Sequence, residues 1–249
     1  MFNSVRRSAD SFGSGLRPRA KIAVTAVAAA WLATALFGTD GLPVARAAES
    51  ASAGAKVLIV TGEDYKGHKW QQTYPVLQAE LAKDPRLTVD AVTELNYLKT
   101  GDLAPYDVIV AHFKNYDPEV PGRKGYDRLE KFVADGGGLV FTHFACGAFQ
   151  EFKDDFTRLA GRAWNPKLRG HDPYGEFTVE IADPDHPVTK GLKPFRITDE
   201  LYTCLDGQTP IHVVATATSK VDQKVYPMAF VLEFGRGRVF HTVLGHNAK

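Results

Sequence analysis

Four of the eight histidines stand where runs of apolar residues end. His68 lies in the polar loop after the first such run, His112 and His143 close two later runs, and His246 follows the last one. Because parallel strands end at the same edge of a sheet, we expect these four side chains to gather at one rim. Imidazole is a frequent ligand of zinc and also transfers protons near neutral pH. The pattern indicates a metal site or an acid–base site.

A second group of reactive side chains is the segment Asp199-Glu200-Leu201-Tyr202. One of its carboxylates suits metal ligation, or service as a general base opposite a histidine acid. His171, in a glycine-flanked loop, is able to reach the same rim. No histidine pair has close helical spacing, so any metal site must be assembled from separate loops. We predict His143, Glu200, His246 and Tyr202 as catalytic residues, and His143, His171 and His246 as ligands of a divalent metal, zinc or manganese.

Substrate contacts are expected around Gly67-His68-Lys69-Trp70, where a glycine allows close approach and an aromatic ring suits stacking on a sugar. We predict His68, Trp70, His112 and Asp199 as substrate-binding residues. Each has a structural alternative. Trp70 suits an anchor in the core for the first helix, and a histidine is more often a surface or core residue than a ligand.

Cys146 follows a strand and precedes Gly147, a position that resembles a nucleophile elbow. A late histidine, His246 or His241, would then act as its base. The segment lacks a glycine immediately before the cysteine, which weighs against this hypothesis. The alternative is a buried thiol, or a pair with Cys204 in an oxidising compartment.

The elements that must position these groups alternate in the first half of the chain. Apolar runs predict strands over 56–61, 87–92, 107–112 and 138–142, and helical spacing predicts helices over 70–83 and 125–134. This alternation is typical of an α/β fold with a largely parallel sheet. In the first helix we expect Val76, Leu77, Ala79 and Leu81 to face inward and Pro75 to lie in the first turn.

The second half has a different pattern. A short helix is predicted over 154–159, and further strands over 176–181, 213–217, 228–233 and 239–243, with a hairpin turn at Gly235-Arg236-Gly237-Arg238. We expect antiparallel additions to the sheet. The chain stops soon after a strand that a helix normally covers, so we expect the sequence to be truncated at its C-terminus.

The N-terminal 47 residues have the features of an export signal. Basic residues precede an apolar stretch over 22–37, and Ala45-Arg46-Ala47 provides a small-x-small cleavage pattern. We predict a signal peptide over 1–47, a linker over 48–55 and one domain over 56–249, in a periplasmic or secreted protein. The apolar stretch is short for a membrane span, which needs about 20 residues. An uncleaved membrane anchor is the alternative.

The bulk composition excludes some partners. The chain of 249 residues is 44% hydrophobic, which suits one well-cored domain. Removal of residues 1–47 leaves 24 basic and 27 acidic side chains, a formal charge of −3. With no basic patch, a nucleic-acid partner is not expected. Sequence sets no oligomeric state, and a homo-oligomer is compatible with it.

Several segments, in order, resemble the ThuA-like (trehalose utilisation) family. They are Val57–Gly62 with Gly67-His68-Lys69-Trp70, Gly136-Gly137-Gly138-Leu139-Val140 with His143, Asp185-His186-Pro187-Val188-Thr189-Lys190-Gly191-Leu192, Asp199-Glu200-Leu201-Tyr202, Gly235-Arg236-Gly237-Arg238-Val239-Phe240, and Leu244-Gly245-His246. The resemblance covers residue 56 to the end of the chain.

The resemblance implies a flavodoxin-like three-layer sandwich related to class I glutamine amidotransferases. It also implies a role in carbohydrate catabolism, on a sugar or a 3-keto-glycoside. The family generally lacks the amidotransferase cysteine machinery, so the resemblance does not favour Cys146 as a nucleophile. Three hypotheses follow: an enzyme with metal-assisted or histidine–carboxylate chemistry on a small carbohydrate, a cysteine-dependent hydrolase, and a non-catalytic carbohydrate-binding domain.

Overall fold

The computed structural model describes residues 54–248. The predicted signal peptide and most of the predicted linker therefore lie outside the described residues. The first half comprises β1 (Ala55–Thr61), α2 (Trp70–Leu81), β2 (Leu87–Val92), α3 (Tyr97–Thr100), β3 (Val108–His112), α4 (Gly122–Ala134) and β4 (Gly138–Thr142). Ala55, assigned to the linker by the sequence, already belongs to β1.

The second half begins with two short 3₁₀ helices, η1 (His143–Gly147) and η2 (Gln150–Phe152), followed by α5 (Lys153–Ala160). The remaining strands are β5 (Ala163–Trp164), β6 (Gly175–Ile181), β7 (Phe195–Asp199), β8 (Leu205–Asp206), β9 (His212–Thr218), β10 (Val225–Phe234) and β11 (Gly237–Thr242). Among residues 54–248, none of the helices combines the length and apolar character that crossing a membrane requires.

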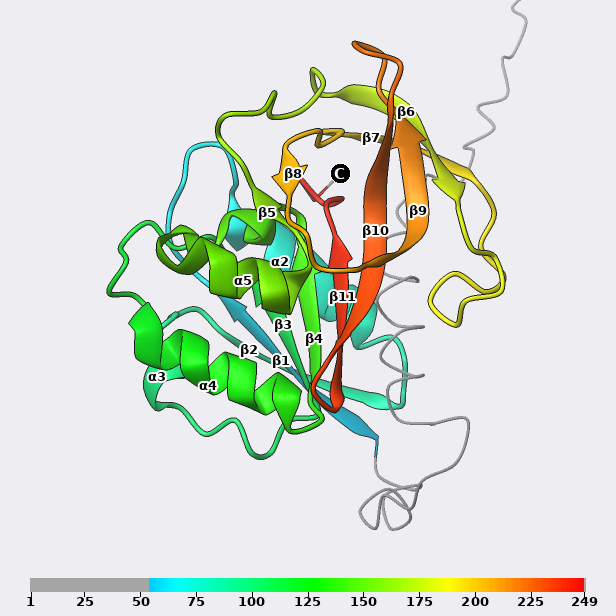
Figure 1. The fold of residues 1–249 in the computed structure, drawn as a ribbon. Coiled ribbons are helices and arrows are strands. Elements are labelled where there is room, and N and C mark those ends of the chain that lie inside the picture. Colours follow the sequence, from blue (N-terminus) through cyan, green and yellow to red (C-terminus); the bar gives the residue numbers. More distant parts are fainter. Residues whose placement is uncertain (1–53, 249) are drawn as a thin grey trace, which may run out of the picture.

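Nine strands form one sheet in the order β2-β1-β3-β4-β11-β10-β9-β6-β7 (Figure 1). The first five are parallel, and β10, β9, β6 and β7 each pair antiparallel with the preceding strand in that order. Five parallel strands in the order 2-1-3-4-5 are the flavodoxin-like arrangement. The predicted fold class is confirmed, including the antiparallel additions in the second half.

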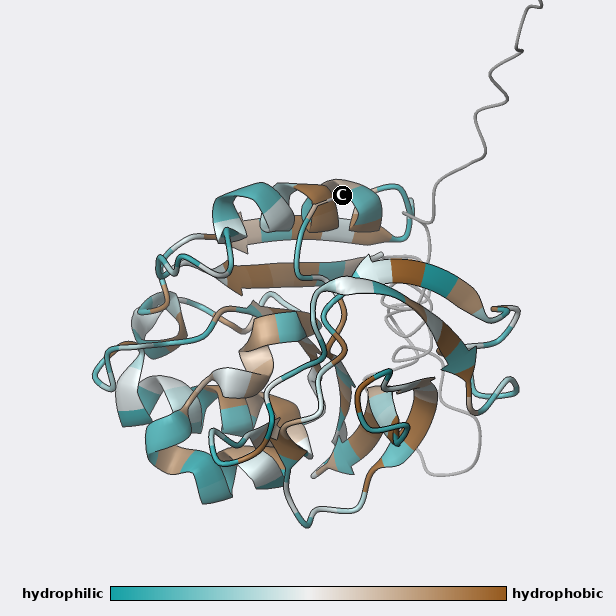
Figure 2. Ribbon diagram, turned by 90° about the horizontal axis from the view of Figure 1, so that it is seen from above, coloured by the Kyte–Doolittle hydropathy of each residue, from teal (hydrophilic) through white to brown (hydrophobic). Residues whose placement is uncertain are grey.

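The sheet separates two apolar cores, because successive residues of a strand point to opposite faces. In β1, Val57 and Ile59 pack in the core that also holds Leu81 of α2. Leu58 and Val60 pack in the opposite core, with Leu129 of α4. Figure 1 shows α2 on one side of the strands and α4 and α5 on the other, and Figure 2 shows the central strands largely hydrophobic. The result is the predicted three-layer sandwich.

β4 is the strand on which the site depends. All five of its residues are buried, and it lies between β3 and β11 with parallel pairing on both sides. Gly136, at φ +116°, provides the turn out of α4 that an L-residue would adopt only with strain. β4 is thus an interior strand whose carboxyl end lies at the edge of the parallel sheet where ligands of such folds bind.

Helix α2 differs from the prediction in its inward face. Val76 is 41% exposed and Ala79 is also exposed, whereas Thr73 and Leu81 are buried and Leu77 packs against the core. The inward positions thus follow a spacing of four, and Thr73 Oγ1 lies 3.0 Å from His112 Nε2. The apolar pattern did not reveal this face because one of its buried positions is a polar residue, Thr73, whose hydroxyl pairs with the buried His112.

Pro75 lies inside α2 rather than in its first turn, since the helix already begins at Trp70. The proline removes one backbone donor. It is exposed, so water can reach the backbone carbonyl that loses its helical partner. Strand β7 was also missed, because its short alternating segment follows Pro194 and carries a single buried residue, Asp199.

His241 yields a prediction about stability. It is buried in β11 between Phe141 and Phe230, its Nδ1–H donates to the Ala160 carbonyl at 3.0 Å, and burial lowers its pKa to about 4. Because the unfolded state binds the proton at a higher pH, this contribution to stability is present above about pH 6.5 and is lost as the pH falls towards 4.

We expect His241 to remove about 2 kcal/mol from the free energy of unfolding between pH 7.5 and pH 5. His241→Gln keeps a donor for Ala160 but does not titrate, so its loss over this range should be smaller by that amount. Urea denaturation at the two pH values measures the difference. Equal losses in the two proteins would contradict the assignment.

Candidate functional site

Strand direction brings the candidate residues to one edge of the sheet. β1, β4 and β11 are parallel, so the residues after them meet at the same edge. Reversal at β10, β9, β6 and β7 then brings the end of β7 and the start of β6 to that edge as well. His171 precedes β6, and Glu200 and Tyr202 follow β7, where an isolated bridge pairs His171 with Tyr202.

His143 lies at the centre of the site. It is the first residue after β4, it has φ +44°, and it is 1% exposed. Its Nδ1 lies 2.7 Å from the carbonyl oxygen of Val243, at the end of β11. A carbonyl oxygen only accepts, so Nδ1 carries the ring proton and donates it. In the neutral ring, Nε2 therefore presents a lone pair to the site.

Three other polar groups meet at that nitrogen. The Tyr202 hydroxyl lies 3.0 Å from His143 Nε2, His246 Nδ1 lies 3.3 Å from it, and Glu200 Oε2 lies 3.6 Å from it. His246 Nδ1 is also 3.1 Å from Glu200 Oε2. The predicted catalytic residues His143, Glu200, Tyr202 and His246 are thus brought together.

The carboxylate of Glu200 is held in its ionised form. Burial by itself would raise the pKa of Glu200, but the neighbouring imidazoles of His143 and His246 outweigh it and hold the pKa well below its usual range. The hydrogen bond to Glu200 correspondingly raises the pKa of His246, against a smaller opposing effect of burial. The site is therefore a negative charge surrounded by imidazoles, which suits protons or a cation.

His68 completes a set of four potential ligands. One atom each from His68, His143, Glu200 and His246 lies within 4.8 Å of all the others. Burial, helped by the charges of His143 and His246, lowers the pKa of His68 to about 3. Its Nδ1 is buried and has no hydrogen-bond partner among the described residues. A neutral ring with an unused nitrogen is suited to metal ligation.

His171 lies beside this set rather than in it. Its Nδ1–H donates to the Asp172 carbonyl at 2.7 Å, so its Nε2 lone pair faces Glu200 Oε1 at 3.5 Å. Its ring stacks on Tyr202 and its side chain is 35% exposed. The group of potential ligands that the structure brings together thus contains His68 and Glu200 but not the predicted ligand His171.

Asp199 supports the site from behind. It is 3% exposed and accepts backbone N–H groups from Gly245 at 2.7 Å, Glu200 at 2.7 Å and His246 at 3.3 Å. One carboxylate thus holds the loop after β7 to the loop after β11. Asp199, predicted as a substrate contact, is not among the residues that line the pocket, and both of its oxygens accept backbone N–H groups.

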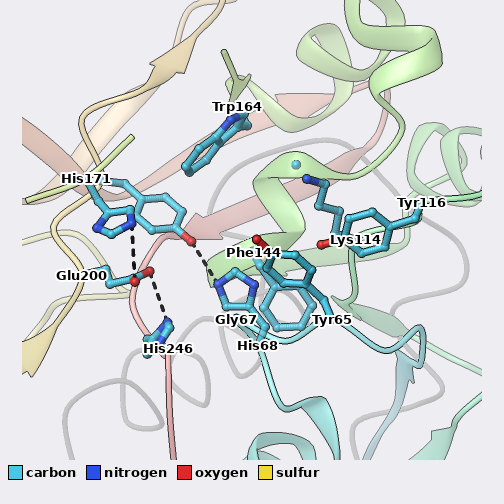
Figure 3. Close-up of a pocket in the computed structure, with 12 residues that line it drawn as sticks. Tyr65, Gly67, His68, Lys114, Tyr116, Phe144, Trp164, His171, Glu200 and His246 are labelled. Carbon is cyan, nitrogen blue, oxygen red and sulfur yellow. Dashed lines mark hydrogen bonds and ion pairs between the residues drawn. The ribbon is translucent and has the colours of Figure 1, made fainter. Parts of the chain in front are cut away.

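The site opens into a pocket of about 150 Å³. Cavities of this order hold one six-membered ring. Figure 3 shows His171, Glu200 and His246 on one side and Lys114 and Tyr116 on the other, with Trp164 between the two sides. Sequence reasoning had not selected Lys114, Tyr116 or Trp164, nor two further lining residues, Tyr65 and Phe144. Lys114 could have been selected from the sequence, because it follows the end of β3 by two residues and so lies at the edge of the sheet where the site forms.

Two further predicted substrate contacts, besides Asp199, lie outside the pocket lining. Trp70 begins α2, where its Nε1–H donates to Asp64 Oδ1 at 2.9 Å. His112 is 3% exposed, and its two ring nitrogens each lie 3.0 Å from a threonine hydroxyl, those of Thr61 and Thr73. Trp164 is the tryptophan that faces the pocket. His112 is instead part of the core, because its strand is buried along its whole length.

The structure gives no support to a cysteine nucleophile. Cys146 lies in η1 and is fully buried, and burial raises its pKa well above the ordinary value. Cys204 is also a buried free thiol whose pKa burial raises to about 12. The two histidines predicted as a base for Cys146 have other partners: His241 bonds the Ala160 carbonyl, and His246 pairs with Glu200.

We therefore expect Cys146 to resist alkylation in the folded protein, because the thiolate is the reactive form and burial suppresses it. Mass spectrometry after treatment with iodoacetamide at pH 8 measures the labelling. The control is the same protein in urea, where both cysteines should react fully. Rapid labelling of native Cys146 would contradict the assignment.

Asp199→Asn should destabilise the fold by about 1–3 kcal/mol, because an amide nitrogen replaces one of the oxygens that accept backbone N–H groups. Urea denaturation measures the change in the free energy of unfolding. The matched control is Asp117→Asn, where an exposed carboxylate accepts a single backbone donor, and the expected change is within about 0.5 kcal/mol. Equal effects of the two substitutions would contradict the anchoring role of Asp199.

Comparison with known proteins supports both fold and family. A family model described as ThuA, trehalose utilisation, matches residues 56–249. A ThuA-like protein of Parabacteroides merdae is 27% identical, with a TM-score of 0.66 over 78% of this chain and 81% of the other. One from Bacteroides uniformis is 19% identical, with a TM-score of 0.61 over 83% and 87%.

A wider structural likeness extends to part of a larger enzyme. A β-galactosidase of Bacillus circulans sp. alkalophilus is 15% identical, with a TM-score of 0.51 over 78% of this chain and 29% of the enzyme. At this identity the likeness shows the fold alone. The search of curated proteins gave no significant match.

Fold and site together define a flavodoxin-like α/β protein with a histidine–carboxylate pocket at the carboxyl ends of its parallel strands. The chain belongs to the ThuA (trehalose utilisation) family, whose model spans the whole described domain. The resemblance seen in the sequence is thereby confirmed, and membership supports a carbohydrate-related role.

Proposed function

We propose that this protein is an enzyme that acts on a small carbohydrate, such as a 3-keto-glycoside, with the help of a divalent metal held by His68, His143, Glu200 and His246. The observation that carries the proposal is the convergence of His143 Nε2, His246 Nδ1 and Glu200 Oε2, separated by 3.1–3.6 Å. Ligands at about 2.0–2.2 Å from a tetrahedral zinc ion are separated by roughly 3.3–3.6 Å.

The donor set fits a divalent ion on chemical grounds as well. The Val243 carbonyl fixes the tautomer of His143, which leaves Nε2 free as a ligand. His68 has a buried nitrogen without a partner among the described residues, and Glu200 is ionised. Two or three imidazoles with one carboxylate suit zinc or manganese. A divalent ion bound there would supply Lewis-acid polarisation of a ketone or alkoxide oxygen.

The surrounding residues suit removal of a proton next to a ketone. His171 presents Nε2 as a lone pair because its Nδ1 donates to Asp172. When Nε2 takes a proton, Glu200 Oε1 at 3.5 Å stabilises the resulting cation. Burial holds the pKa of Tyr202 well above its ordinary value, so its hydroxyl stays protonated and can donate to a substrate oxygen.

These roles define a reaction class. In a 3-keto-glycoside, the hydrogen on carbon 2 is acidified by the neighbouring ketone, and His171 would remove it. The bond from carbon 1 to its oxygen substituent can then break as the double bond between carbons 1 and 2 forms. The proton that His171 gained then passes to the departing oxygen, which leaves as an alcohol and restores the base. Trp164 provides an apolar wall for the ring, a common feature of small-molecule pockets.

The central test is zinc or manganese binding by the purified full chain. We expect one equivalent to bind, and Glu200→Gln or His246→Ala to weaken binding by about 100-fold or more, because each removes a proposed ligand. Calorimetric titration measures the affinity, and turnover of a 3-keto-glycoside should fall in parallel.

The matched control is His212→Ala. His212 also pairs with a carboxylate, at 2.7 Å from Asp183, but it begins β9 at the opposite edge of the sheet. Its metal affinity and turnover should equal those of the parent protein. Equal affinity in Glu200→Gln would refute the metal proposal. Sugar binding with no turnover of any keto-glycoside would favour the carbohydrate-binding alternative.

Export of the protein completes the proposal. The basic and apolar pattern of the N-terminal 47 residues supports cleavage after Ala47 and a periplasmic or secreted location. An extracytoplasmic protein would meet carbohydrate before uptake into the cell.

A further inference from the structure

The pocket has a second charged end that the metal and acid–base chemistry does not use. Lys114 lines the pocket on the side opposite Glu200, next to Tyr116 (Figure 3). It follows β3, so the same edge of the sheet that positions His143 also delivers this ammonium group. A cation at one end and a metal-ligand set at the other define two points of contact for one small molecule.

Lys114 has no acidic partner within the described chain. The ion pairs of residues 54–248 do not include it, and its ammonium makes a cation–π contact, with Nζ 4.9 Å from the centre of the Tyr116 ring. Tyr116 in turn stacks on Tyr65, at a separation of 5.3 Å between ring centres. The two rings form an aromatic wall that holds the lysine but does not neutralise it.

The position of Lys114 also depends on a glycine in the wall of the pocket. A Cβ atom added to Gly147 would lie 3.1 Å from Lys114 Cδ and 3.4 Å from its Cε. Gly147 belongs to η1, the segment that begins with His143. The absence of a side chain at this position therefore gives the lysine stem room beside the proposed reaction centre.

From this geometry we propose that Lys114 binds an anionic substituent of the substrate, so that the preferred ligand is a sugar acid or a sugar phosphate rather than a neutral sugar. This inference rests on the proposed function for the location of the sugar ring. The ammonium group of the half-buried Lys114 has no carboxylate partner among the described residues, and it gains a charge-assisted hydrogen bond when an anionic oxygen enters the pocket. The ring then lies between this anchor and His143.

The test compares three probes that differ in one substituent: D-glucuronate, D-glucose 6-phosphate and D-glucose. Calorimetry with the zinc-loaded full chain should show at least one of the two anions binding about tenfold or more tightly than D-glucose. A preference for glucuronate identifies a carboxylate site, and a preference for the phosphate identifies a phosphate site.

Lys114→Met should abolish the preference while it keeps the length of the side chain, and Lys114→Arg should retain part of it because the charge remains. Lys190→Met, which removes an exposed lysine outside the pocket lining, is the control and should bind all three probes like the parent protein. Folding of each variant is checked by circular dichroism.

Two results would overturn the inference. One is that neither anion binds more tightly than D-glucose to the parent protein, and the other is that Lys114→Met keeps the preference. The proposed function can fail separately. If metal-dependent turnover of a neutral keto-glycoside persists in Lys114→Met, the proposed function stands. If the protein takes up no metal but still binds an anion selectively through Lys114, only the proposed function is refuted and the anion site stands.

Discussion

The site depends on one hydrogen bond, from His143 Nδ1–H to the carbonyl oxygen of Val243 at 2.7 Å. It joins the ends of the neighbouring strands β4 and β11, and it determines which nitrogen of His143 faces the pocket. The positive φ of His143 turns the chain sharply where β4 stops, so the side chain lies at the centre of the edge. With Nε2 thus presented, Tyr202, His246 and Glu200 have a common point on which to converge.

The site also requires that the loops after β7 and β11, which are far apart in the sequence, lie side by side. Asp199 meets it by accepting backbone donors from both the loop after β7 and the loop after β11. The antiparallel half of the sheet has the same effect at a larger scale, because four strand reversals return β7 to the edge where β4 ends. A buried carboxylate and a strand order, rather than a short sequence motif, assemble the pocket.

The α/β class and the convergence of His68, His143 and His246 could be predicted because both follow from buried runs and their ends. The same rule failed for His112, which is the last residue within its strand rather than a loop residue, and lies against two threonines in the core. His171 and Glu200 could not be assigned relative positions, since this requires β7, which the sequence pattern did not reveal. Trp164 was missed because it belongs to β5, a strand of two residues that produces no apolar run, and Lys114 was missed although it follows the end of β3 by two residues.

The central claim is that His68, His143, His246 and Glu200 form a metal site. Anomalous diffraction from crystals of the full-length protein grown with zinc tests it most directly. The account predicts a single strong peak within about 2.0–2.2 Å of His143 Nε2, His246 Nδ1 and a Glu200 oxygen. A pocket without anomalous density, or zinc bound only at the His212–Asp183 pair on the opposite edge, would contradict it.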